Sequence, residues 1–167
     1  MNARLLRARP QSGDYEELYF YAQSDTLCVL FETEDYEEYC GIFGVGCMDY
    51  SKVVFDKDIA FIIACGQGYI FDINKRKILH LTQNDTLQDV VITGFNGYFI
   101  TCDDLSLSLY DTDLVWQSQR VSYDGIELDE VKEGVLYGKV WDLYEWHPFT
   151  LDLSSFRYKC KWICKEC

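Results

Sequence analysis

A degenerate repeat of about 40 residues constrains the fold of this chain more than any other feature of its sequence. Three copies can be read, at residues 53–81, 90–118 and 126–162. A fixed period of this length indicates supersecondary units that are stacked or arranged radially, because a single unit of this size cannot bury its own hydrophobic face.

Marker residues keep the three copies in register. The cysteine that ends FIIAC recurs 37 positions later at the end of YFITC, as Cys65 and Cys102. An aspartate that closes an apolar segment recurs at steps of 39 and 41, as Asp72, Asp111 and Asp152. Because an aspartate carboxylate can accept a hydrogen bond from backbone two residues further on, we predict that each of these aspartates opens a turn.

Each copy divides into short segments with the composition of β-strands. In the first copy, residues 59–65, 69–71 and 77–81 are rich in β-branched and aromatic residues and are separated by turn residues. In the second copy, leucines alternate with serines along residues 105–110, which is the period of a half-buried strand. Four short strands in about 40 residues is the layout of a propeller blade.

A fourth and more divergent copy fits residues 18–47. Residues 18–22 and 27–31 have strand composition, an acidic turn follows, and residues 39–45 suit a returning strand. Together the copies resemble β-propeller repeats of the WD-repeat and quinoprotein type, and the segment WDLYEWHPFTLDL is similar to the ends of uncharacterised bacterial proteins. The resemblance implies a propeller fold and no particular activity, because propellers host many unrelated functions.

We therefore predict an all-β chain that forms a propeller-like fold or partial propeller of three to four four-stranded antiparallel units. A propeller ring has to close, or its edge strands stay open to other chains. The chain is then either a small closed ring or a partial propeller completed by a second copy or a partner. An irregular β-sandwich or barrel of about 14 strands is the alternative.

Length and composition predict a single soluble domain spanning residues 1–167. A hydrophobic content of 49% excludes a disordered chain. No apolar run approaches the ~18 residues needed to cross a bilayer, so we expect no membrane association. Residues 1–13 contain arginines without an apolar segment, so we expect a basic tail rather than a signal peptide, and a cytoplasmic protein.

The charge of the chain is uneven. The net charge is −13, residues 1–10 and 157–167 each carry +3, and the segment between them carries −19. Such an acidic body repels phosphate backbones, so we predict that the protein does not bind nucleic acid. The acidic excess favours a basic protein partner instead.

The eight cysteines are expected to be reduced in a cytoplasmic protein. Those in apolar strands are expected to be small buried side chains: Cys28, Cys65 and Cys102. The C-terminal spacing C-x3-C-x2-C supplies three thiols: Cys160, Cys164 and Cys167. Zinc takes four ligands, and Cys40 or Cys47 could supply the fourth if the ends of the chain meet. Because no second CxxC pair exists, we nevertheless predict no metal site.

The sequence carries no arrangement typical of an active site. His80 lies in an expected strand and His147 beside a proline in an expected turn, and no nucleophile, zinc-peptidase or phosphate-loop motif is present. The repeated aspartates lack the twelve-residue loop of a calcium site. We therefore predict no enzymatic activity and no cofactor.

An acidic, tyrosine-rich segment is the strongest candidate for a protein-binding surface. It carries carboxylates that would steer a basic partner and tyrosines that offer rigid contact area. Its residues are Glu32, Glu34, Asp35, Tyr36, Glu37, Glu38 and Tyr39, with Tyr15 and Tyr19 nearby in the sequence. The alternative is a solvated acidic loop without a binding role.

A second group of residues could form an exposed ligand-binding platform or fill the core between blades. Its members are Trp141, Tyr144, Trp146 and His147.

Three functions fit these features. The first is a non-catalytic protein-interaction module, such as an acidic immunity-type inhibitor of a basic toxin or nuclease. The alternative is a small-ligand-binding, sugar-binding or enzymatic propeller with an aromatic pocket. The third is self-association, as a homodimer of partial propellers.

Overall fold

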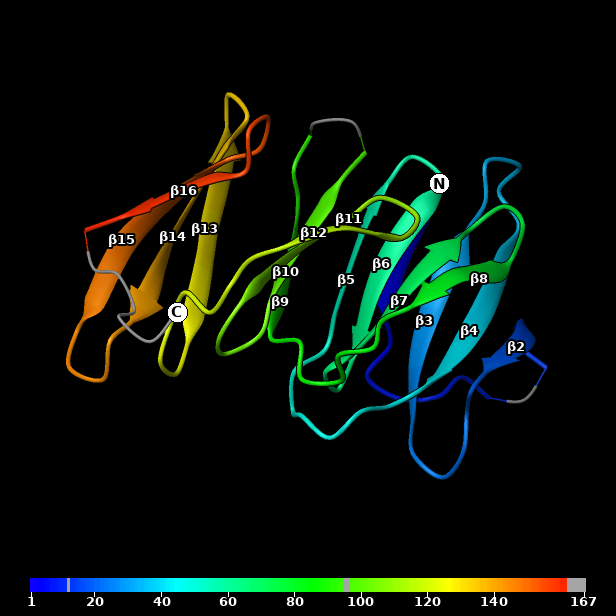
Figure 1. Cartoon of the computed structure of the whole chain (residues 1–167). Helices are drawn as coiled ribbons and strands as arrows, with labels where there is room; N and C mark the ends of the chain where they lie inside the picture. The colour runs from blue at the N-terminus through cyan, green and yellow to red at the C-terminus, as the bar shows by residue number, and fades with distance from the viewer. Residues whose placement is uncertain (12, 95–96, 162–167) are drawn as a thin grey trace. The chain divides into compact units, whose positions relative to one another are not determined.

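A computed structural model describes residues 1–11, 13–94 and 97–161. The chain forms two compact units, Met1–Leu87 and Gln88–Cys167, and each contains two four-stranded sheets (Figure 1). The described residues form sixteen strands and no helix. They therefore contain no apolar helix long enough to cross a membrane. These sheets confirm the all-β class and the four-stranded unit.

The first sheet departs from the expected pattern in two ways. Its strand order is β1-β3-β4-β2, and β2 runs parallel to β4, whereas an entirely antiparallel unit was expected. The prediction of a basic tail is wrong at its start, because β1 pairs antiparallel with β3 and Ala3 is buried. The strands are β1 (Asn2–Leu5), β2 (Glu16–Phe20), β3 (Thr26–Glu32) and β4 (Glu38–Gly44).

The second sheet is an antiparallel meander, as the first repeat copy predicts. Its inner strands are almost wholly buried, which matches their continuous runs of β-branched and aromatic residues. The strands are β5 (Lys52–Asp56), β6 (Ile59–Ala64), β7 (Gln67–Asp72) and β8 (Lys77–Leu81).

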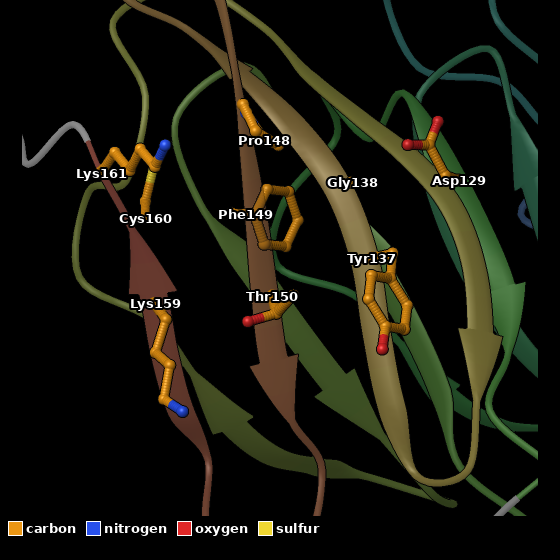
Figure 2. Close-up of a pocket in the computed structure, with 9 residues that line it drawn as sticks. All are labelled: Asp129, Tyr137, Gly138, Pro148, Phe149, Thr150, Lys159, Cys160 and Lys161. Carbon is orange, nitrogen blue, oxygen red and sulfur yellow. The ribbon is translucent and has the colours of Figure 1, made fainter.

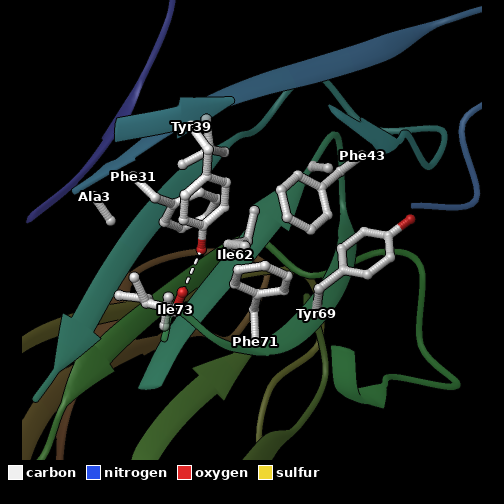
Figure 3. Close-up of a cluster of buried hydrophobic side chains, with 11 residues drawn as sticks. Ala3, Phe31, Tyr39, Phe43, Ile62, Tyr69, Phe71 and Ile73 are labelled. Atoms are coloured by element: carbon white, nitrogen blue, oxygen red, sulfur yellow. Dashed lines mark hydrogen bonds between the residues drawn. The ribbon is translucent and has the colours of Figure 1, made fainter. Parts of the chain in front are cut away.

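An aromatic core joins these two sheets within the Met1–Leu87 unit (Figure 3). The ring of Phe31 from β3 stacks on Phe71 from β7 with centroids 4.9 Å apart. The ring of Phe43 from β4 meets Phe71 edge-on at 5.5 Å. Stacked and edge-on pairs stabilise by about 1 kcal/mol beyond the apolar area that they bury.

The Gln88–Cys167 unit also contains two antiparallel meanders that share one core. Leu107 and Leu109 of one sheet pack in that core with Leu136, Phe149 and Leu151 of the other. The first meander is β9 (Asp89–Ile92), β10 (Phe99–Cys102), β11 (Leu107–Tyr110) and β12 (Leu114–Gln117). The second is β13 (Ile126–Lys132), β14 (Val135–Trp141), β15 (Trp146–Asp152) and β16 (Arg157–Cys160).

The repeated aspartates form the predicted turns. The carboxylate of Asp72 accepts a 2.7 Å hydrogen bond from the backbone N–H three residues on. The carboxylates of Asp111 and Asp152 each accept a 2.9 Å bond from the backbone N–H two residues on. These bonds satisfy donors that the sheet does not use. Asp72 and Asp152 are the last residues of their strands, Asp111 directly follows β11, and each begins a hairpin turn.

Candidate interaction surfaces

The acidic hairpin, residues 32–38, connects β3 to β4 through a turn organised by Thr33. The Thr33 N–H donates to the Glu37 carbonyl at 2.9 Å, and the Tyr36 N–H donates to the Thr33 carbonyl at 3.2 Å. The Thr33 hydroxyl in turn accepts the Glu37 N–H at 3.2 Å. Tyr36 has a φ of 63°, a left-handed conformation that costs a non-glycine residue about 1 kcal/mol.

This turn exposes Tyr36 among carboxylates. The Tyr36 side chain is 81% exposed, and the acids on both sides of it reach solvent. Within the described residues, Glu34, Asp35 and Glu38 form no ion pair. The apex of the hairpin therefore combines a large amphipathic side chain with negative charge that no other described residue neutralises.

Arg76 ties the hairpin to the turn between β7 and β8. Its guanidinium lies 2.5 Å from a carboxylate oxygen of Glu37 and 2.6 Å from one of Glu16. It also lies over the ring of Tyr39, 4.8 Å from the centroid. Exposed ion pairs of this kind stabilise weakly, so Arg76 positions the hairpin more than it strengthens the fold.

Two of the tyrosines predicted for this surface do not lie on it. Tyr39 has no exposed surface, and its hydroxyl donates a 2.6 Å hydrogen bond to the Ile73 carbonyl. It pairs across the sheet with Phe31 and so shares the inward face, which makes its assignment to the surface wrong. Tyr15 is half-buried and packs against the cluster of Cys28 and Cys40.

Tyr19 is exposed, but it belongs to a separate network on β2. Its hydroxyl donates to Glu17 at 2.6 Å, and the Arg9 guanidinium lies over its ring at 5.4 Å. Arg9 also pairs with Glu17, and these contacts lower the pKa of the Glu17 carboxyl. The sequence placed Arg9 in a tail and did not connect it to Glu17.

The aromatic hairpin, residues 141–147, connects β14 to β15. Trp141 and Trp146 pair across the two strands, with ring centroids 5.4 Å apart. Trp146 is 40% exposed and Tyr144 is 86% exposed, so these side chains do not fill a core.

Asp142 organises this hairpin. Its carboxylate accepts backbone N–H bonds from Tyr144 and Glu145, both at 2.8 Å, and lies 2.7 Å from Nε2 of His147. The bonds from Glu145, His147 and Tyr144 lower the pKa of the Asp142 carboxyl to about 2. His147 therefore holds the turn in place and is half-buried beside it.

The outward face of the last sheet carries a shallow hollow of about 440 Å³ that the sequence did not predict (Figure 2). Tyr137, Thr150 and Lys159 lie opposite one another on three neighbouring strands and therefore share this face. The hollow is lined by Asp129, Tyr137, Gly138, Pro148, Phe149, Thr150, Lys159, Cys160 and Lys161. Buried residues alternate with half-buried or exposed ones along much of β14 and β15, as on a half-buried sheet.

The described cysteines form no disulfide bond, and Cys28 and Cys40 lie in one buried cluster. Cys28, Cys40 and Cys102 are buried, and Cys65 is half-buried where a buried side chain was expected. Cys164 and Cys167 lie outside the described residues. Within the described ranges, no three His, Cys, Asp or Glu side chains are grouped to hold a metal ion. His80 lies on β8 and is half-buried.

Comparisons with known proteins do not assign this chain to a family. No family model and no curated protein matches this chain, so nothing there supports the resemblance to WD-repeat or quinoprotein blades. Among solved structures, one similar chain is the crystal structure of the computationally designed Ika4 protein. It is 11% identical over 67% of this chain and 89% of that chain, with a TM-score of 0.43, a similarity too low to carry a functional inference.

Proposed function

We propose that this chain is a non-catalytic protein-interaction module that binds a basic partner protein through its acidic hairpin. The observation that carries the proposal is Tyr36, which is 81% exposed and held in a hydrogen-bonded turn next to Glu34 and Asp35, neither of which forms an ion pair within the described residues. Tyrosine is one of the residue types that dominate binding energy at protein interfaces.

Preorganisation of the turn supports this proposal. Binding costs free energy when a flexible loop has to be ordered, and Thr33 already closes this loop with hydrogen bonds at both ends. Arg76 fixes the Glu37 side of the hairpin from the neighbouring turn. The hairpin can therefore meet a partner with little rearrangement.

The carboxylates suggest the chemistry of the partner. Five acids in seven residues would attract a basic surface over about 10 Å at ordinary ionic strength and speed its association. A nuclease or other toxin that binds phosphate backbones carries such a surface. An immunity-type inhibitor that covers it is the most specific form of this proposal.

The test is affinity capture with the whole chain and a matched pair of variants at low and high salt. The hairpin variant combines Glu34→Gln, Asp35→Asn and Tyr36→Ala. Retention of a basic protein that elutes as salt rises, and that the hairpin variant fails to retain, is the expected result. Its affinity should fall by about tenfold or more when the hairpin is changed.

The control variant changes a similar number of exposed side chains in the other unit: Asp124→Asn, Glu130→Gln and Tyr144→Ala. It should retain the same partner as the unmodified chain. If the hairpin variant retains the same proteins as this control, the acidic hairpin is not the binding surface.

The alternative function is small-ligand binding at the aromatic hairpin. The exposed Trp146 beside Trp141 is the observation that favours it, because the exposed face of an indole ring can stack on a flat ligand. Trp146→Ala would then abolish ligand-dependent changes in tryptophan fluorescence and leave capture of the basic partner intact.

A further inference from the structure

A polar pocket lies within the Met1–Leu87 unit, where the connection between β2 and β3 meets the ends of β4, β7 and β8. Its volume is about 340 Å³. It contains no residue of the acidic hairpin or the aromatic hairpin, and neither of the functions proposed above uses it.

Polar side chains converge on this pocket with unused hydrogen-bonding capacity. Gln23, Ser24 and Asp25 extend from the β2–β3 connection, and within the described residues their side chains have no hydrogen-bond partner. Gln67 also lines the pocket, and its Nε2 donates to the carbonyl of Thr82 at 2.9 Å. This bond fixes the Gln67 amide and leaves its carbonyl oxygen as an acceptor.

Aromatic and aliphatic surface completes the wall. The Tyr69 hydroxyl is held by the Gly44 carbonyl at 2.8 Å, so its ring keeps one orientation. The ring of Tyr21 lies 6.4 Å from that of Tyr69 and is 67% exposed. Val45 and Leu81 add half-buried aliphatic surface.

A glycine allows the close backbone approach that forms this wall. A Cβ atom at Gly44 would lie 2.4 Å from the backbone oxygen of Tyr21. Any other residue would push the Tyr21 backbone away from β4. Tyr21 itself has a φ of 52°, which is a left-handed backbone conformation. This part of the pocket wall therefore consists of the Tyr21 backbone packed directly against Gly44.

We propose that this pocket binds a neutral polyhydroxylated ring of monosaccharide size. No Lys or Arg is among its described lining residues and Asp25 contributes a carboxylate, which disfavours an anionic ligand. Carboxylate and amide groups bond well to ligand hydroxyls, and the face of Tyr21 suits the C–H face of a sugar ring. The volume is at the small end of known ligand pockets, which suits one ring.

The test is backbone-amide NMR of the whole chain with glucose, galactose, mannose and N-acetylglucosamine, each at about 20 mM because weak sites have millimolar Kd values. At least one sugar should shift the amides of Gly44, Gly46 and Gln67 in a saturable way. Asp25→Asn should weaken that affinity by about tenfold, because it removes charge-assisted hydrogen bonds without changing the side-chain size.

Tyr21→Ala should have an effect of similar size through the lost ring face. Tyr36→Ala is the matched control, because it removes another exposed tyrosine at a left-handed position in the same unit, outside the pocket. The proposal is overturned if no sugar shifts the pocket amides, or if Asp25→Asn binds as tightly as Tyr36→Ala. It is equally overturned if only a cationic probe such as spermidine produces the shifts.

Discussion

The hydroxyl of Tyr39 donates a 2.6 Å hydrogen bond to the backbone carbonyl of Ile73, and both residues are fully buried. This bond joins β4 of the first sheet to the turn that follows β7 of the second (Figure 3). Burial raises the pKa of the Tyr39 hydroxyl above its usual range, so the group stays a neutral donor.

Replacing Tyr39 with phenylalanine should lower the free energy of unfolding by about 1–2 kcal/mol, because the Ile73 carbonyl would lose its buried donor. Urea denaturation of the whole chain measures the change. An unchanged midpoint with an unchanged m-value would show that this bond contributes nothing to stability.

Replacing Tyr158 with phenylalanine should have the opposite sign. Its hydroxyl is buried with no hydrogen-bond partner among the described residues, while its ring stacks on Phe149 at 5.3 Å. Removing an unsatisfied hydroxyl and keeping the ring should stabilise the Gln88–Cys167 unit by about 1 kcal/mol. A destabilisation as large as that of Tyr39→Phe would mean that the hydroxyl has a partner after all.

Gly138 on β14 should tolerate no side chain. A Cβ atom there would lie 2.3 Å from the Glu127 carbonyl oxygen and 2.6 Å from the Phe149 ring. Gly138→Ala should therefore cost about 2 kcal/mol or more of unfolding free energy, measured by thermal or urea denaturation.

The matched control is Gly134→Ala in the neighbouring hairpin turn. A Cβ atom at Gly134 meets nothing within 4 Å, but its φ of +76° disfavours alanine. This change should cost about 1 kcal/mol. Equal losses for the two variants would contradict the steric argument at Gly138.

Acid should destabilise the Gln88–Cys167 unit through its turn aspartates. Hydrogen bonds from Ser154 and Ser155 lower the pKa of the Asp152 carboxyl to about 2, below the value of about 3.9 expected in the unfolded chain. A lowered folded-state pKa means that the stabilisation is complete above pH ~4 and is lost as the pH falls towards 2.

Asp152→Asn should remove part of this pH dependence. The variant should lose less stability than the unmodified chain as the pH falls from about 5 to about 2, the range over which the contribution of Asp152 is lost. Urea titrations at several pH values in this range measure the difference. Identical pH profiles would show that Asp152 is not among the groups responsible.

Cysteine alkylation should follow burial. Cys47 is exposed, whereas Cys40 and Cys102 are buried, and burial raises the pKa of the Cys40 thiol to about 12 and that of Cys102 above its usual range. Because the thiolate is the reactive form, iodoacetamide should label Cys47 first and reach Cys40 and Cys102 only on unfolding. Peptide mass spectrometry gives the order, and early labelling of Cys40 would contradict its burial.

Local patterns in the sequence predicted the strands and turns that depend on neighbouring residues. The predicted segment 77–81 matches β8 at both ends. The turn aspartates at 72 and 152 behave as expected because their hydrogen bonds span only two or three residues. The exposed acids of the acidic hairpin were likewise readable, since consecutive charged residues cannot be buried together.

Contacts between distant segments could not be predicted in this way. The polar pocket combines Tyr21, Gly44 and Gln67, which lie in three segments that nothing in their local sequence connects. The parallel pairing of β2 with β4 and the strand formed by residues 2–5 also depend on long-range register.

Tyr39 illustrates the difference between what local sequence predicts and what the tertiary structure decides. Its position in an acidic, tyrosine-rich run marked the hairpin correctly, but whether its ring faced solvent or core depended on the register between β3 and β4. The sequence alone determined an all-β chain of repeated four-stranded units with an acidic turn at residues 32–38. Only the tertiary structure decided which side chains face inward and which residues meet in a pocket, because those choices depend on pairing energies between segments far apart in the chain.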